Sequence, residues 1–300
     1  MKAGAVLVVV AACILLLLGL GVLLSLLFAG FSPDTAFFSG GQAALIELKG
    51  DISNDSGLLS ANLTAEETAA LISKADSDPS ISGILLEINS GGGSVVASKE
   101  IVRALRAAKK PKVAVIRDIG ASGAYYAASA CDFIIADEDS LTGSLGAISV
   151  RLNLADLREK IGIGADSFSK GENKGMGDPF SELSEEERGI MQSIVDQAWQ
   201  GFKDNVLEFR GEKLDKKRLD EIFDGRIMSG KQALSYGLID ATGTKEDAIK
   251  KLGELTGIEE PSLRRLAPEK SLFSMLSQMG YSFGTGFKSS LSSGEIKLQS

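Results

Sequence analysis

A strand, a glycine-rich turn and the start of a helix follow one another in residues 84–96, which read ILLEINSGGGSVV. The apolar run Ile84–Ile88 is short and ends in turn residues, as a buried strand does. Helical spacing follows from Val96 to Ala108. The glycines between them leave backbone N–H groups bare at a helix N-terminus, which suits an anion or an oxyanion. The turn alone fits a phosphate site or a plain turn equally well.

Strands and helices alternate on both sides of this stretch. Before it, an apolar β-type run at residues 43–48 precedes Thr64 and Glu67, which form a capping box at the start of an Ala/Leu-rich helix. After it, we expect strands at residues 113–116 and 133–135 and helices at residues 123–130 and 154–161. This alternation predicts an α/β fold with a largely parallel sheet.

A long amphipathic helix is expected to follow a second capping box, formed by Ser184 and Glu187. Its apolar residues recur at helical spacing, and we interpret them as a stripe that packs on the sheet. The stripe consists of Ile190, Met191, Ile194, Val195, Ala198, Phe202, Val206 and Phe209. A third α/β portion spans Asp224–Gly257, with helices expected at residues 231–236 and 245–255.

The chain has no histidine, which excludes every Ser-His-Asp or Cys-His arrangement and every His-ligated zinc site. A general base must therefore be Asp, Glu, Lys or Tyr. The net charge of −8 argues against a nucleic-acid partner, because no basic stripe is available for phosphates. The two cysteines, Cys13 and Cys131, lie far apart, so we expect no disulfide or cysteine metal site and interpret Cys131 as a small core residue.

Residues 3–33 carry no charge and are rich in Val and Leu, so we expect residues 1–33 to form a transmembrane anchor. A cleaved signal peptide and a lipoprotein box at residues 10–13 are alternatives, but the apolar run continues where both would turn polar. Lys2 before the helix places the N-terminus in the cytoplasm and the body outside it. We expect a linker at residues 34–42 and a Ser/Gly-rich tail at residues 258–300.

A second glycine turn, GASGAYY at residues 120–126, also joins a strand to a helix. Ser122 would lie in a tight turn with an exposed hydroxyl beside the Gly123 N–H, as a nucleophile does. A plain serine N-cap fits this position equally well, so the distinction depends on a partner base. Lys170 and Lys174 lie in a glycine-rich loop. To act as a base, either lysine needs its pKa lowered from about 10.4 by roughly 3 units, through burial or a nearby positive charge.

Taken in order, these motifs resemble the short, single-domain form of the signal peptide peptidase SppA family, which is related to Clp protease and crotonase. The resemblance runs over Ala43–Gly257 and includes LTGSLG at residues 141–146, Lys174 ahead of Asp178-Pro179, and the segments 185–201 and 224–240. It implies a repeated ββα superhelix and a single peptidase domain at residues 43–257.

The resemblance implies Ser122 as nucleophile, Lys174 as general base and Ser144 as the hydroxyl that orients the lysine amine. It implies an oxyanion hole formed by Gly93 and Gly123, with Gly92 as a further candidate. Two positions depart from the family pattern. Gly91 stands where the family usually has proline, and Gly175 where it often has an acidic residue, so Lys170 remains an alternative base.

The implied activity is that of a membrane-anchored serine endopeptidase that hydrolyses remnant signal peptides or other unfolded apolar peptides without a metal or cofactor. The resemblance also implies a ring-shaped homo-oligomer in which serine and lysine come from adjacent subunits. Three alternatives remain open at this point: a catalytically silent peptide-binding membrane scaffold of the same fold, a related Ser-Lys peptidase for a specific membrane protein, and a crotonase-like acyl-CoA enzyme.

Overall fold

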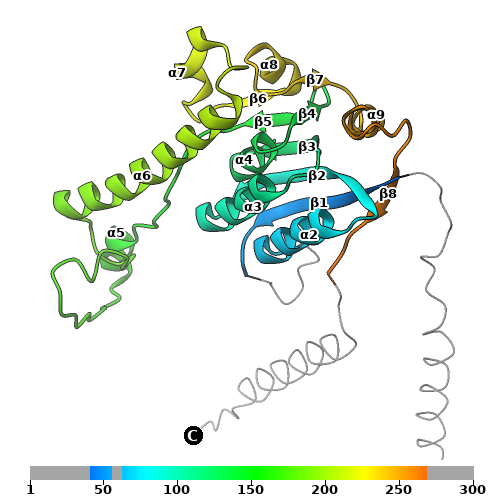
Figure 1. Cartoon of the computed structure of the whole chain (residues 1–300). Helices are drawn as coiled ribbons and strands as arrows, with labels where there is room; N and C mark the ends of the chain where they lie inside the picture. Colours follow the sequence, from blue (N-terminus) through cyan, green and yellow to red (C-terminus); the bar gives the residue numbers. More distant parts are fainter. Residues whose placement is uncertain (1–40, 56–62, 269–300) are drawn as a thin grey trace, which may run out of the picture. The chain divides into compact units, whose positions relative to one another are not determined.

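The computed structural model describes residues 41–55 and 63–268 (Figure 1). The expected anchor at residues 1–33, most of the expected linker and the chain beyond residue 268 lie outside the described residues. Within the described ranges, no helix is both long and apolar enough to span a bilayer.

A sheet of eight strands forms the centre of the described chain. The strand order is β6-β5-β3-β2-β1-β8, and β4 pairs with both β3 and β7. Every pairing is parallel except that of β5 with β6. The strands are β1 (Gln42–Ile52), β2 (Ile81–Gly93), β3 (Lys112–Ala121), β4 (Phe133–Ala136), β5 (Leu141–Gly143), β6 (Ile227–Ser229), β7 (Ala241–Thr242) and β8 (Ser262–Arg265). The predicted α/β fold with a largely parallel sheet is confirmed.

Helices cover both faces of the sheet, which explains why its central strands read as continuous apolar runs. Ile46, Leu86 and their neighbours pack with α2 (Ala65–Ser77), α3 (Val95–Ala107) and α4 (Gly123–Ser129) in the larger core. Leu45 and Leu85 point the other way and pack with α9 (Lys245–Thr256) in a smaller core. Cys131 is buried in the larger core, as expected for a small core residue.

The folded domain extends past the expected boundary at Gly257. Strand β8 lies parallel to the first residues of β1, with Gln42 opposite Ser262 and Leu45 opposite Arg265. Residues 262–265 read SLRR, in which Leu263 is the single apolar residue, so the sequence carries no strand signal here. The backbone pairing with β1 stabilises this strand, which its side chains alone do not favour.

The long helix α6 (Glu185–Arg210) begins at the predicted capping box, since the Ser184 hydroxyl accepts from the Glu187 N–H and the Glu187 carboxylate accepts from the Ser184 N–H. Its apolar stripe is only partly core. Phe202 and Val206 are buried, whereas Ile194 is 54% exposed. The prediction that the whole stripe packs on the sheet is wrong for the N-terminal half, because that half extends beyond the sheet beside α5 (Ala155–Ile161) (Figure 1).

The C-terminal end of α6 is fixed to the sheet by a buried ion pair. The Arg210 guanidinium is 1% exposed and donates to Asp240 Oδ2 at 2.7 Å and to the Gly237 carbonyl at 2.8 Å. Asp240 also accepts from the Ile134 N–H in β4 and from Lys213. Burial alone would raise the pKa of Asp240, but these donors outweigh it and lower that pKa. The remaining helical segments are Lys216–Arg218, α7 (Leu219–Ile222) and α8 (Gly230–Ser235).

Candidate active site

The two glycine turns meet at one edge of the sheet. Because parallel strands end on the same side, the ends of β1, β2, β3 and β5 lie next to one another. Gly93 pairs with Ile52, Ser90 with Gly120, and Ala121 with Gly143. Ser122 therefore follows β3 directly beside the end of the first glycine turn.

Ser122 has a strained backbone that its neighbours hold in place. Its φ is 53° and its ψ −124°, a conformation that is uncommon for a residue with a side chain. The Ser122 N–H donates to the Gly143 carbonyl at 2.9 Å, and its carbonyl accepts from the Tyr126 N–H at 2.9 Å. The Ser122 side chain makes no capping hydrogen bond to α4, so the N-cap interpretation is wrong and the hydroxyl is left for another role.

Glycine is required where the two turns touch. A Cβ on Gly92, whose φ is 103°, would lie 2.7 Å from the Gly123 nitrogen and 2.8 Å from Ser122 Cβ. A Cβ on Gly93 would lie 2.2 Å from the Ile52 carbonyl oxygen. These contacts are shorter than van der Waals packing allows. The backbones of the two turns can approach this closely only without side chains.

The candidate oxyanion donors are not equivalent. The Gly92 N–H donates to Ser90 Oγ at 3.1 Å and is therefore already used, so Gly92 contributes close approach rather than a donor. The Gly123 N–H belongs to the first turn of α4, where helical N–H groups have no intrahelical acceptor. The Gly93 nitrogen lies 3.4 Å from the position that a Cβ on Gly123 would take. Gly93 and Gly123 thus remain the candidate pair of oxyanion donors beside Ser122.

Ser144 lies at the same edge. It directly follows Gly143, whose carbonyl accepts from the Ser122 N–H, and its own N–H donates to the Arg226 carbonyl at 2.7 Å. Ser144 also has a φ of 53° and is half-buried. Ser122 and Ser144 are the two residues other than glycine with a positive φ in the described chain, and the sheet edge brings them together.

Lys174 is not part of this cluster within one chain. Its side chain is exposed, and its N–H donates to the Gly171 carbonyl in a local turn. The segment between α5 and α6, which carries Lys174, lies well away from α4 in Figure 1. Lys170 is exposed on the same segment. The chain therefore assembles the serine, the glycines and Ser144, but brings neither lysine to them.

A small cavity of about 30 Å³ adjoins Ser122 between α3, α4 and α6. Besides Ser122 and Gly93, its walls include Ser98, Tyr126 and Phe202. These three residues were not predicted as site residues. Phe202 was assigned to the core stripe. The sequence does not mark Ser98, whose place in the cavity wall follows only from its contact with Gly123 in the folded chain.

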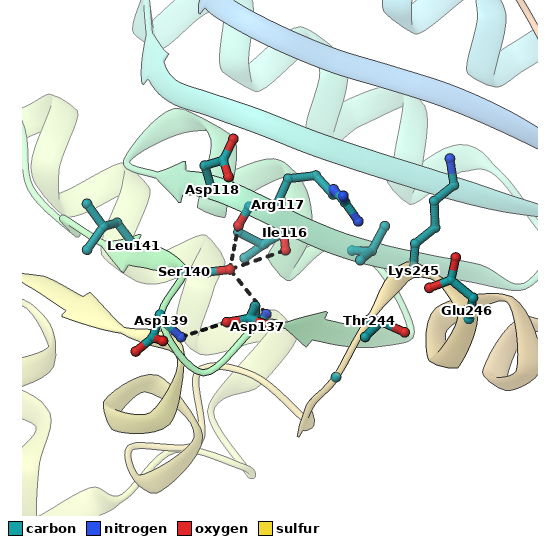
Figure 2. A pocket seen from close by; sticks show the side chains of 12 residues that line it. Ile116, Arg117, Asp118, Asp137, Asp139, Ser140, Leu141, Thr244, Lys245 and Glu246 are labelled. Atoms are coloured by element: carbon teal, nitrogen blue, oxygen red, sulfur yellow. Dashed lines mark hydrogen bonds between the residues drawn. The ribbon is translucent and has the colours of Figure 1, made fainter.

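A second hollow, of about 630 Å³, lies where β3 changes partners (Figure 2). β3 pairs with β4 up to Ile116 and with β5 from Ile119. Ser140 lies at this change of partner and links the loop before β5 to β3. Its Oγ donates to the Arg117 carbonyl and accepts from the Asp137 N–H at 3.1 Å. None of the expected site residues lines this hollow.

Comparison with known proteins identifies a family. Residues 104–259, which include Ser122 and Lys174, match the model of Peptidase family S49. A putative protease of Methanocaldococcus jannaschii is 32% identical over 90% of this chain and 88% of its own length. A putative signal peptide peptidase SppA of Enterococcus faecium is 36% identical over 63% of this chain, and the chloroplastic serine protease SPPA of Arabidopsis thaliana is 33% identical over 85%. The matches cover 57% and 39% of those two relatives.

Proposed function

The chain belongs to the SppA group of peptidase family S49, and on that premise we propose that it is a membrane-anchored serine endopeptidase of the Clp protease and crotonase type. One observation carries the proposal. Ser122 is held in a strained conformation at a glycine-lined sheet edge, with a side chain that caps nothing. Strain of this kind costs about 1–3 kcal/mol and persists mainly where a function requires it.

We assign the general base to Lys174 of a second copy of the chain. The support is an exposed apolar surface on residues 148–195, which we call the arm. In the arm, Ile148 is 86%, Val150 79% and Phe168 97% exposed. Soluble monomers rarely expose so many large apolar side chains on one segment. A second copy would cover them and carry its own arm, with Lys174, to the neighbouring Ser122, as in a closed ring of identical subunits.

In the proposed mechanism, neutral Lys174 takes the proton of Ser122 Oγ as that oxygen attacks a peptide carbonyl. The N–H groups of Gly93 and Gly123 stabilise the resulting oxyanion. Protonated Lys174 gives its proton to the leaving amine, and water activated by the same lysine then hydrolyses the acyl-enzyme. The Ser144 hydroxyl would hydrogen-bond the lysine amine and orient it.

The surroundings of the site favour unfolded apolar peptides as substrates. Val95 and Val96 follow the glycine turn and are 43% and 65% exposed. An extended apolar segment, such as a remnant signal peptide, would cover these side chains while its carbonyl lies over Ser122. With residues 1–33 as the anchor, the peptidase body would lie on the extracytoplasmic side of the membrane.

The test uses the full-length chain in detergent and an unfolded apolar peptide as substrate. We expect Ser122→Ala and Lys174→Ala each to lower kcat/KM by about a thousandfold or more, because the dyad acts as a unit. Lys174 is exposed, so its variant should unfold at the same urea concentration as the wild type. If both variants keep wild-type rates, the dyad is wrong.

Reaction with a fluorophosphonate separates the peptidase from a silent scaffold of the same fold. An activated Ser122 should be labelled, and Ser122→Ala should not be. Peptide binding without any labelling would favour the scaffold.

A further inference from the structure

We propose that Asp224 and Arg226 are positioning residues, which hold Ser144 where its hydroxyl meets the general base. Both lie in the short turn Asp224-Gly225-Arg226, between α7 and β6. None of the proposed catalytic steps uses this turn. The inference rests on the proposed function, because it takes the Ser144 hydroxyl as the partner of the lysine amine.

The backbone of the turn directly contacts the loop that carries Ser144. The Arg226 carbonyl accepts from the Ser144 N–H at 2.7 Å. A Cβ on Gly143 would lie 3.0 Å from the same carbonyl oxygen, and a Cβ on Gly146 would lie 3.3 Å from Gly225 Cα. The antiparallel pairing of β5 with β6 begins at the next residue of the turn strand. The position of the turn therefore fixes the loop after β5.

Ser144 depends on such a contact because its φ of 53° is uncommon for a residue with a side chain. A conformation of this kind persists only where the surrounding structure enforces it. The same loop also borders the nucleophile, since the Gly143 carbonyl accepts from the Ser122 N–H at 2.9 Å. A small displacement of the turn would therefore move the Ser144 hydroxyl relative to Ser122.

The side chains of the turn fix its backbone. The Asp224 carboxylate accepts from the Arg226 N–H at 2.9 Å, from Arg226 Nε at 2.9 Å and from Arg226 Nη2 at 2.6 Å. Arg226 Nη1 also donates to Glu221 Oε2 at 2.9 Å. A guanidinium with two parallel bonds to one carboxylate has a defined orientation. The hydrogen bonds from Arg226 lower the pKa of Asp224, so this carboxylate stays charged at neutral pH.

Both flanks of the turn are anchored, so its own three residues decide where the Arg226 carbonyl lies. Before the turn, Phe223 is 6% exposed, and its carbonyl accepts from Trp199 Nε1 of α6 at 3.3 Å. After the turn, Met228 of β6 is 2% exposed. The pair of Asp224 and Arg226 is itself exposed and contributes little to the free energy of unfolding. Its loss should therefore affect the position of Ser144 more than the fold.

The experiment measures kcat and KM of the full-length chain on an unfolded apolar peptide. Arg226→Ala should lower kcat about tenfold and leave KM and the urea midpoint unchanged, because it displaces a group that acts in the transition state. Asp224→Asn keeps an acceptor for the Arg226 N–H, so its kcat should fall by a smaller factor. The matched control, Arg106→Ala, removes the arginine of another exposed ion pair and should leave kcat unchanged.

A double-mutant cycle tests whether the turn acts through Ser144. In a Ser144→Ala background the hydroxyl is already absent, so Arg226→Ala should lower kcat by less than about twofold. A tenfold loss in both backgrounds, or full activity of Arg226→Ala, would overturn the proposal. Asp224→Asn carries the cycle if Arg226→Ala does not fold. Failure of the proposed function looks different, because the wild-type chain would then hydrolyse no peptide and Ser122 would not react with a fluorophosphonate.

Discussion

The sheet edge around Ser122 and the arm at residues 148–195 are built in opposite ways. At the edge, glycines and serines are fixed by backbone contacts so close that a single Cβ would collide. In the arm, Gly164, Gly175, Gly177 and Gly189 have no heavy atom within 4 Å of the position a Cβ would take, and Phe168 is 97% exposed. A single chain therefore assembles the nucleophile half of the proposed site, and in the proposed assembly a second copy supplies Lys174.

Helix α6 connects these two regions and shows the same contrast along its length. Its C-terminal end carries the buried pair of Arg210 and Asp240, and its N-terminal end carries the exposed pair of Arg188 and Glu185. Buried charges lose much when a partner is removed, while exposed pairs contribute little. The free energy of unfolding should therefore depend on the C-terminal end of α6 and not on its N-terminal end.

The largest effect on stability is expected at the C-terminal end of α6. Asp240→Ala leaves the Arg210 guanidinium buried without its carboxylate and should lower the free energy of unfolding by about 3–5 kcal/mol. Urea unfolding followed by circular dichroism measures this loss. The matched control, Glu185→Gln, should leave the urea midpoint where it is. Equal shifts in the two variants would contradict the contrast.

The same pair predicts a dependence on pH. The pKa of Asp240 is lowered in the folded chain, so its contribution is complete above the unfolded value near 3.8 and is lost as pH falls from there through the folded pKa. Wild-type stability should thus fall more steeply than that of Asp240→Asn below about pH 4. Urea midpoints of the two proteins between pH 7 and pH 3 test this. If the urea midpoints of the two proteins fall in parallel as the pH is lowered, carboxylates other than Asp240 cause the loss of stability in acid.

A smaller effect is expected from adding one methyl group in each region. Gly93→Ala places a Cβ against the Ile52 carbonyl and should lower the free energy of unfolding by about 1–3 kcal/mol and reduce peptide hydrolysis. Gly189→Ala places a Cβ in open space within α6 and should raise the stability slightly, by up to about 1 kcal/mol, since alanine favours helix. Thermal unfolding of the two monomeric variants distinguishes them, and a destabilised Gly189→Ala would show that position 189 is packed within the single chain.

The smallest effect on the fold of one chain is expected in the arm itself. Phe168→Ser should leave the urea unfolding of the monomer unchanged, because the ring is exposed in the single chain. It should nevertheless lower both the molecular mass measured by light scattering and the rate of peptide hydrolysis, because a second copy no longer binds the arm. An unchanged mass together with unchanged activity would remove the arm from the interface.

The sequence predicts the core well where side chains alone decide. Runs such as Ile84–Ile88 are apolar on both faces because both faces are covered, and the capping boxes at Thr64 and Ser184 form as expected. The sequence does not predict strand β8, because the backbone makes its pairing and its residues are mostly polar. The apolar residues of α6 recur at helical spacing along the whole helix, but this spacing does not show which part of the molecule packs against them.

The candidate site divides in a similar way. The glycine turns predict Ser122, Gly93 and Gly123 as site residues. Only the folded structure distinguishes a serine with a φ of 53° from an N-cap, or shows that the Gly92 N–H is already bonded to Ser90. The cavity residues Ser98 and Phe202 come together from two helices far apart in sequence. Lys174 cannot be placed from one chain by either route, because its partner lies on another surface in the proposed assembly.

The central claim is that one copy supplies the serine and another the lysine. Full-length chains carrying Ser122→Ala and Lys174→Ala should each be inactive alone, and their co-assembly, confirmed by two different affinity tags, should restore peptide hydrolysis. In a random mixture about a quarter of the wild-type rate is expected, since half the chains keep the serine and half of their neighbours keep the lysine. Co-assembled chains that remain as inactive as either variant alone would contradict the shared site.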